Sequence, residues 1–292
     1  MGNTCFVNAT LQCLTYTPEL QQYMVQYQAN HCPNASDCIM CALAQHMQSC
    51  FHDSKRILKP HNILQLLKAR HMRWGRQEDA HEFLRFLIDA LHKSCLAASK
   101  QSDDDDDDVS FIHHLFAGQL RSQVICDMCQ WTSNTYDPFL DICLDVKTSS
   151  SITQALQSFV TCELLDGDNS YFCSSCKKNV TARKLFSIHK PPRILTLQLK
   201  RYGMSGGKVT RHITFPHQFN AHPYTSSSLQ NNPTCMYDLY AVLVHDGHST
   251  NSGHYYCYVK TKAGLWFCMN DHMVRQSTLD EVLSSEAYLL FY

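Results

Sequence analysis

Apolar residues at helical spacing predict two helices in the first hundred positions. Near the amino terminus they recur every three or four residues from Phe6 to Leu14, and Pro18 ends the run. A longer amphipathic pattern over residues 77–96 predicts the second helix. Its apolar stripe consists of Ala80, Phe83, Leu84, Leu87, Ile88 and Leu91. Helical patterns of this kind dominate up to about residue 118.

Beyond that point the pattern changes to the alternation of apolar and polar residues that is typical of β-strands. Residues 195–200 and 237–245 alternate in this way. Strands are also predicted for 254–259, 265–271 and the aromatic-rich 287–292. The chain is therefore predicted to have an α+β fold, with a helical part followed by a sheet.

Composition narrows the class of protein. The 292 residues suit either one elongated domain with an inserted subdomain or two domains. Lysine and arginine together number 25 and aspartate and glutamate 26, so no basic surface for nucleic acid or for an anionic membrane is expected. No apolar run approaches the roughly 18 residues that a membrane span needs. We predict a protein that binds neither nucleic acid nor membrane.

The chain contains 16 cysteines. Such a number would suit a secreted disulfide scaffold, but the chain is large and its first residues form no apolar signal segment. We therefore predict reduced thiols, several of them bound to metal, and an intracellular location, nuclear or cytoplasmic.

Cys5 stands where a turn of small and capping residues, Gly2 to Thr4, leads into the first helix. Backbone N–H groups at a helix start favour a negatively charged sulfur, although a lone cysteine there is more often a small buried apolar residue. His254 and Asn270 follow far downstream, in the Cys, His, Asn order of papain-type thiol proteases. The pattern predicts Cys5 as nucleophile, His254 as base, and Asn270 or the adjacent Asp271 as the group that orients the imidazole.

Two pairs of cysteines have the C-x₂-C spacing of zinc ligands: Cys126 with Cys129, and Cys173 with Cys176. We predict one structural Zn²⁺ at these four thiolates, since they leave no open position for an activated water. A second zinc site is a further hypothesis, and the alternative is ordinary helix packing. Its candidate ligands are Cys32, Cys38 and Cys41, with His31 or His46 as the fourth.

Four sequence blocks together resemble the catalytic domain of the ubiquitin-specific proteases, which are cysteine deubiquitinases. They are residues 2–12, 77–83, 195–202 with 215–216 downstream, and 237–259 with 287–292 at the end. The resemblance covers essentially the whole chain and implies a single catalytic domain with the papain-like right-hand fold. In this fold a helical thumb lobe (1–117) carries the cysteine, zinc-ribbon fingers (118–190) form an extension, and a β-sheet palm lobe (191–292) carries the histidine.

The resemblance implies hydrolysis of the peptide or isopeptide bond after the C-terminal glycine of ubiquitin. In the family, acidic residues of the second block contact arginines of the ubiquitin tail, so Asp79 and Glu82 are predicted substrate contacts. Gln77 and Tyr255 are predicted to join them. The expected partners are ubiquitin and ubiquitinated proteins, and the expected oligomeric state is a monomer.

One feature departs from the family pattern. The family usually has an asparagine five residues before the nucleophile that helps to bind the oxyanion, and the sequence starts four residues before Cys5. Without that donor, the developing charge would depend on the Cys5 backbone N–H and on the side chain of Asn3 or Gln12. A catalytically weak or silent ubiquitin-binding module is therefore the alternative function, while Cys5, His254 and Asn270 favour the enzyme.

Overall fold

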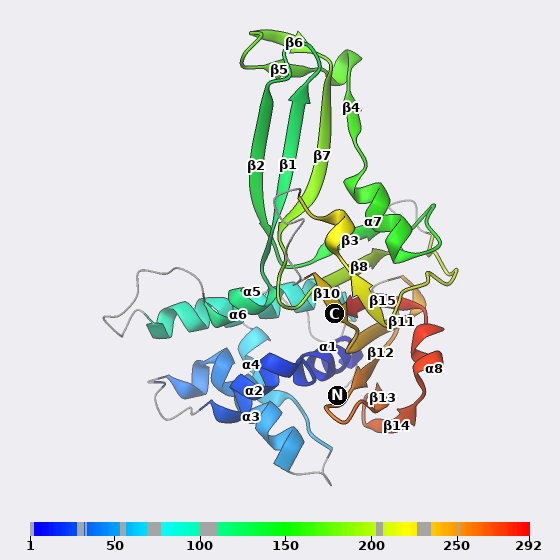
Figure 1. The fold of residues 1–292 in the computed structure, drawn as a ribbon. Helices are drawn as coiled ribbons and strands as arrows, with labels where there is room; N and C mark the ends of the chain where they lie inside the picture. The colour runs from blue at the N-terminus through cyan, green and yellow to red at the C-terminus, as the bar shows by residue number, and fades with distance from the viewer. Residues whose placement is uncertain are drawn as a thin grey trace.

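The computed structural model describes residues 3–27, 32, 34–52, 57–68, 77–99, 110–202, 207–226, 235–249 and 252–292. Figure 1 shows a helical lobe and a sheet lobe side by side, with a long β extension rising from them. We call these three parts the thumb, the palm and the fingers. Gly2 and His31 lie outside the described residues. Within the described ranges, every helix is too short or too polar to cross a membrane.

The thumb consists of helices, as the apolar spacing predicted. They are α1 (Cys5–Thr15), α2 (Pro18–Gln26), the 3-10 turn η2 (Ala35–Asp37), α3 (Ile39–His52), α4 (His61–Lys68), α5 (Ala80–Ser99) and α6 (Phe111–Phe116). Helix α5 was predicted to begin at residue 77 but begins at Ala80. The Asp79 carboxylate accepts a hydrogen bond from the His81 backbone N–H at 2.7 Å, so Asp79 caps the helix instead of joining it.

The palm is a seven-stranded sheet with the strand order β14-β13-β12-β11-β15-β8-β3. Its strands are β3 (Ile142–Asp145), β8 (Thr196–Lys200), β11 (Ala241–Ser249), β12 (Ser252–Lys260), β13 (Trp266–Asn270), β14 (Met273–Ser277) and β15 (Ala287–Phe291). Strand β3 pairs with β8 in parallel, and the other neighbours are antiparallel. Strand β3 thus belongs to the palm sheet, although its sequence position falls in the range predicted for the fingers.

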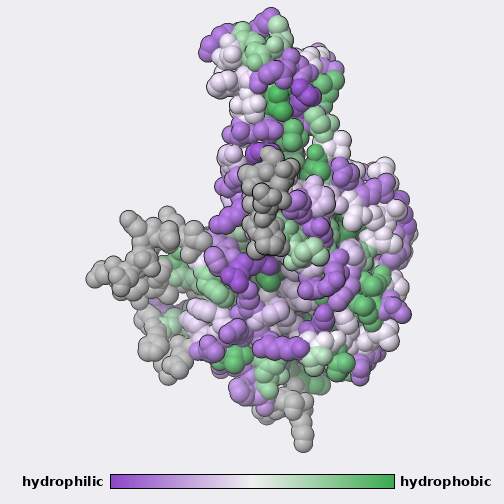
Figure 2. Space-filling model, viewed as in Figure 1, coloured by the Kyte–Doolittle hydropathy of each residue, from purple (hydrophilic) through white to green (hydrophobic). Residues whose placement is uncertain are grey.

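The fingers are built on a second, four-stranded sheet with the order β2-β1-β7-β4. The strands are β1 (Gly118–Cys126), β2 (Thr132–Phe139), β4 (Glu163–Leu165) and β7 (Ala182–Lys190), with the hairpin β5 (Tyr171–Cys173) and β6 (Lys178–Val180) at the tip. Figure 2 shows hydrophobic patches among hydrophilic ones on this extension. The large apolar side chains that are exposed in the fingers include Met128, Trp131, Leu164 and Phe172.

Alternating residues of the palm strands enter two different cores. Leu243, Tyr255 and Cys257 face the thumb helices and join their apolar core. The opposite face packs with Val242 and Tyr258 into a second core. Further elements join the second core or flank it: α7 (Ile152–Val160), β9 (Gln218–Asn220), η4 (His222–Tyr224), β10 (Met236–Asp238) and α8 (Leu279–Leu283). The exposed 3-10 turn η3 (Gly167–Asn169) lies between β4 and β5 in the fingers.

Helix α1 packs directly on β12, and also contacts β11 and β13. Its apolar residues Phe6, Leu11 and Leu14 are almost completely buried in the thumb core. Because α1 is clamped between the thumb helices and the palm sheet, its first residue, Cys5, is held at the junction of the two lobes.

Candidate active site

Cys5 is the first residue of α1, and its residue surface is 8% exposed. Asn3 has φ = 58°, so the chain turns tightly before the helix, as the small residues there predicted. The predicted side-chain cap is wrong at Thr4, whose side chain makes no capping hydrogen bond; its carbonyl accepts the Asn8 N–H at 3.0 Å. The N–H groups of the first helical turn have no partner within the helix, so the Cys5 N–H is a donor beside the sulfur.

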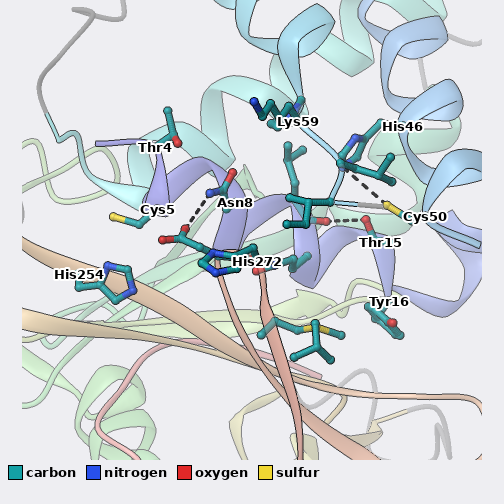
Figure 3. Close-up of a pocket in the computed structure, with 18 of the residues that line it drawn as sticks. Thr4, Cys5, Asn8, Thr15, Tyr16, His46, Cys50, Lys59, His254 and His272 are labelled. Carbon is teal, nitrogen blue, oxygen red and sulfur yellow. Dashed lines mark hydrogen bonds between the residues drawn. The ribbon is translucent and has the colours of Figure 1, made fainter. Parts of the chain in front are cut away.

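His254 and Asn270 are brought together by the neighbouring strands β12 and β13. His254 Nε2 lies 2.6 Å from Asn270 Oδ1. An amide oxygen can only accept, so Nε2 carries the proton and Nδ1 keeps its lone pair. Cys5 and His254 line the same end of one cavity of about 670 Å³ (Figure 3). A thiol and a basic ring nitrogen therefore share one site.

Asp271, the alternative orienting group, has a different position. Its Oδ1 accepts from Asn8 Nδ2 at 2.7 Å, and its backbone carbonyl accepts from Gln12 Nε2 at 3.1 Å. Asp271 has φ = 52°, the left-handed turn that ends β13 and aims its side chain at α1. Asp271 therefore ties the palm to the helix of the nucleophile, and Asn270 contacts the imidazole.

Gln12, one of the predicted hydrogen-bond donors to the oxyanion, already has partners in the structure. The Gln12 amide is engaged on both sides, because its Oε1 also accepts from the Cys257 thiol at 3.6 Å. Gln77 instead reaches the nucleophile: its Nε2 donates to Cys5 Sγ at 3.3 Å, and its Oε1 accepts the Gly253 N–H at 2.8 Å. Gln77 was predicted as a substrate contact, and nothing in the sequence placed its amide on the sulfur.

The two glycines of the β11–β12 hairpin are needed for close packing. A Cβ on Gly247 would lie 2.3 Å from the Ser252 carbonyl oxygen, and one on Gly253 would lie 2.4 Å from the Asp246 carbonyl oxygen. Gly253 also has φ = 148°. Only glycine fits at these two positions. The close packing of the hairpin places the N–H of Gly253, the residue before His254 in the sequence, within hydrogen-bond distance of Gln77.

Two substitutions of Gln77 distinguish the roles of its hydrogen bonds to Cys5 and to Gly253. Gln77→Ala removes both, whereas Gln77→Glu keeps an oxygen for the Gly253 N–H but removes the donor to Cys5. We expect both variants to lower kcat/KM for ubiquitin–aminocoumarin by about a hundredfold, because a donor beside the reacting atoms is lost in each. Near wild-type activity of Gln77→Glu, with an unchanged melting temperature, would show that only the tie to Gly253 matters.

The predicted tail contacts lie at the start of α5, on the side of Cys5 that Gln77 occupies. Asp79 is half-buried, and its two oxygens accept from the Tyr288 hydroxyl at 2.9 and 2.7 Å. Glu82 is exposed. Tyr255 was predicted to contact substrate directly, but its exposed fraction is 0%, so it supports the wall of the site from inside.

Tyr255 packs on His245, with ring centroids 4.1 Å apart. Burial lowers the pKa of His245 to about 4, so this imidazole is neutral near pH 7. His245 is a structural residue under the β11–β12 hairpin, and His254 is the imidazole that faces the cavity.

The four cysteines of the two C-x₂-C pairs meet at the tip of the fingers, although the pairs lie far apart in sequence. All four Sγ atoms lie within 4.8 Å of one another, with 3.9 Å between Cys126 and Cys176 and 3.7 Å between Cys129 and Cys173. Tetrahedral zinc with Zn–S bonds near 2.3 Å needs sulfurs about 3.8 Å apart. Gln130 and Lys177, each directly after a pair, have matching φ values of 58° and 55°. The donor set therefore fits zinc.

The second candidate metal cluster is only partly assembled in the described residues. Cys32, Cys38 and Cys41 have sulfurs within 4.8 Å of one another. His46 is not part of this group: its Nε2 lies 3.8 Å from Cys50 Sγ, and the residue lines the cavity beside α1. His46 comes five residues after Cys41 on α3, which turns it to another face of the helix.

The thiol, the oriented imidazole and the thumb–palm junction define a papain-like cysteine hydrolase. The family model described as ubiquitin carboxyl-terminal hydrolase matches residues 1–292. The chain belongs to this family.

Individual relatives agree with this assignment. Human ubiquitin carboxyl-terminal hydrolase 42 is 44% identical over all of this chain, which spans 22% of that protein. Human ubiquitin carboxyl-terminal hydrolase 17-like protein 6 is 42% identical, and the chain spans 72% of it. For human 17-like protein 22, also 42% identical, the chain spans 54%.

Solved structures share the fold. The SAGA Ubp8/Sgf11/Sus1/Sgf73 DUB module bound to ubiquitin aldehyde contains a chain with a TM-score of 0.86 and 32% identity, covering all of this chain and 68% of that one. A second structure of the module, bound to monoubiquitin, gives a TM-score of 0.86 and 34% identity over 67% of that chain. These matches confirm the predicted right-hand fold.

Proposed function

We propose that this protein is a cysteine-dependent deubiquitinase that hydrolyses the peptide or isopeptide bond after the C-terminal glycine of ubiquitin. The observation that carries the proposal is the placement of Cys5 and His254 at one end of a single cavity, with the His254 ring oriented by Asn270. Ubiquitin aldehyde and monoubiquitin in the related Ubp8 modules support ubiquitin as the substrate. The intact set of three residues favours catalysis over a silent binding module.

The reaction follows from the residue types. The Cys5 sulfur adds to the carbonyl carbon of the terminal glycine while His254 Nδ1 holds the thiol proton. The C–N bond then breaks, and the lysine amine leaves with that proton. A water molecule adds to the thioester and gives a proton to His254, and the C–S bond breaks to release the ubiquitin carboxylate and return the proton to sulfur. The Cys5 N–H and the Gln77 amide are the nearby donors for the oxyanion.

Labelling with ubiquitin C-terminal vinyl sulfone tests the proposal. The wild-type protein is expected to gain one ubiquitin, attached at Cys5 in the digested peptide. Cys5→Ser keeps the size of the side chain and is expected to remain unlabelled while still binding ubiquitin. Labelling at another cysteine, or binding of ubiquitin without any labelling of the wild type, would contradict the proposal and support the silent module.

The acidic start of α5 supports recognition of the ubiquitin tail. Glu82 is exposed and available for a charge-assisted pair with an arginine. Asp79 is fixed by its hydrogen bonds to Tyr288 and to the start of α5. We propose that it stabilises the wall of the tail-binding site and also contributes negative charge there.

Charge reversal at Glu82 is expected to raise KM for ubiquitin–aminocoumarin about tenfold, because one charged hydrogen bond is replaced by repulsion. Asp89→Arg is the matched control, since Asp89 lies farther along α5 and pairs with Lys93 at 2.7 Å. Ubiquitin with glutamate in place of the tail arginines should recover activity with Glu82→Arg only. Equal KM values for Glu82→Arg and the wild type would remove Glu82 from substrate binding.

We also propose two structural zinc ions per chain. The four sulfurs at the finger tip support the first, and Cys32, Cys38 and Cys41 support the second. The remaining candidate for the fourth ligand, His31, lies outside the described residues. Ser94 Oγ lies 3.1 Å from Cys38 Sγ and would help to orient this ligand. The expected metal content is two zinc ions, falling to one in Cys38→Ser. One zinc ion in both proteins would mean that the three thumb thiols pack without metal.

A further inference from the structure

The cavity at the nucleophile extends well beyond Cys5 and His254. It continues along α1, past Asn8 and Thr15, and residues 57–60 line its other side. His46, Cys50 and Tyr16 lie at the opposite end from Cys5 and His254 (Figure 3). Among the described residues, none of those that line it comes from α5 or from the segment 77–79. The cavity therefore leads away from the predicted tail contacts.

The chemistry divides the substrate at the point where the sulfur attacks. Everything on the carbonyl side of the scissile bond must lie on one side of Cys5, and the leaving amine must lie on the other. Under the proposed function, on which this inference rests, the ubiquitin tail occupies the side of Gln77, Asp79 and Glu82. The remaining side of the nucleophile is the cavity along α1.

We propose that this cavity binds the polypeptide segment that carries the modified lysine, with the leaving amine at His254 and the flanking residues along α1. A single lysine side chain would fill only a small part of 670 Å³, so the space suits flanking residues as well. The cavity would thus select the protein from which ubiquitin is removed, separately from the recognition of ubiquitin itself.

The lining of the cavity indicates which segment fits. Its apolar wall can hold an aliphatic or aromatic side chain and consists of Leu11, Leu58, Pro60, Met269 and Val274. Lys59 and His272, both exposed, lie at the cavity, and in the described part of the chain Lys59 forms no ion pair. The Asp271 carboxylate also lines the cavity; it accepts a hydrogen bond from the neutral Asn8 amide, which fixes its position beside α1 and leaves its negative charge there.

The remaining titratable side chains of the lining change this balance little. Burial lowers the pKa of His46, so its imidazole is neutral near pH 7. Cys50 is also neutral, because burial raises the pKa of its thiol to about 11. Lys59 is therefore a positive charge at the cavity without an ion pair in the described residues, and the cavity favours a segment with an acidic residue to meet it and an apolar residue for the apolar wall, both close to the modified lysine.

Three substrates with the same ubiquitin half test this assignment. They are ubiquitin–aminocoumarin, ubiquitin isopeptide-linked to a peptide with acidic residues beside the lysine, and the same conjugate with basic residues there. Lys59→Glu is expected to lower kcat/KM for the acidic conjugate about fivefold and to raise it for the basic one, as reversal of an exposed charge allows. The rate with ubiquitin–aminocoumarin should stay within about twofold of the wild type.

Lys262→Glu is the matched control, since Lys262 is an exposed lysine outside the cavity lining. It should leave all three rates unchanged. The same ratio of acidic to basic conjugate in Lys59→Glu and the wild type would overturn the assignment. A wild-type protein that cleaves none of the three substrates would instead overturn the proposed deubiquitinase activity, so the two failures are distinguishable.

Discussion

Replacing His254 with alanine is expected to lower kcat/KM for ubiquitin–aminocoumarin by about a thousandfold or more. The imidazole is the only described side chain that we assign to take the Cys5 proton and return it to the leaving amine, and such proton transfer contributes roughly a hundredfold to ten-thousandfold in rate. Vinyl sulfone labelling of Cys5 should slow in parallel, because it needs the same thiolate. The melting temperature should change little, since His254 is only half-buried and lines the cavity.

Variants of the two neighbouring residues assign the orienting group. Asn270→Ala is expected to cost about tenfold to a hundredfold, because the hydrogen bond that holds Nε2 is lost. Asn270→Asp places a carboxylate oxygen at the same position and should retain most of the activity. Asp271→Ala breaks the tie to Asn8 and should cost less than Asn270→Ala. The reverse order of these two alanine variants would assign the orienting role to Asp271.

Local chemistry in the sequence was sufficient to predict that Cys5 and His254 share one cavity and that the four cysteines of the two C-x₂-C pairs lie together. A cysteine at a helix start and a C-x₂-C pair can both be recognised from the local sequence. The helix dipole acts on a residue in the first turn, and a C-x₂-C pair supplies two thiolates to one metal ion from neighbouring positions. The alternation of residues 195–200 and the aromatic-rich segment 287–292 likewise predicted β8 and β15 of the palm. Strand β8 alternates in sequence, whereas β15 is buried along its whole length and is therefore a continuous apolar run.

The features that the local sequence pattern did not predict depend on partners far away in the chain. Asp79 looked helical until its carboxylate was seen to cap α5 and bind Tyr288, which lies 209 residues later. Tyr255 looked like a surface contact, but β12 directs it into the core beside His245. The sequence left the choice between Asn270 and Asp271 open, and the left-handed turn at Asp271 gives the two residues different partners. Such facts follow from tertiary pairing, which a single sequence does not encode in its local pattern.

Loss of one finger cysteine is expected to have the largest effect on structure. In Cys173→Ser the finger-tip zinc should be lost, and residues 126–132 and 171–180 should exchange their amide hydrogens rapidly. The tip has little else to hold it, because among the described residues its apolar cluster has three buried members, Cys126, Cys173 and Val180, with the partly buried Tyr171 and Cys176 packed against them. Binding of structural zinc is worth on the order of 10 kcal/mol in zinc-finger peptides, far more than three small side chains can supply.

The matched control is Cys162→Ser, since Cys162 is an exposed finger cysteine outside the cluster. It should keep the wild-type zinc content and the slow amide exchange of the tip. The palm and thumb cores contain none of the four ligands, so Cys173→Ser should retain a cooperative unfolding transition while its KM for ubiquitin substrates rises. Unchanged zinc content in Cys173→Ser, or slow exchange at a tip that has lost its metal, would show that side-chain packing rather than zinc maintains the fingers.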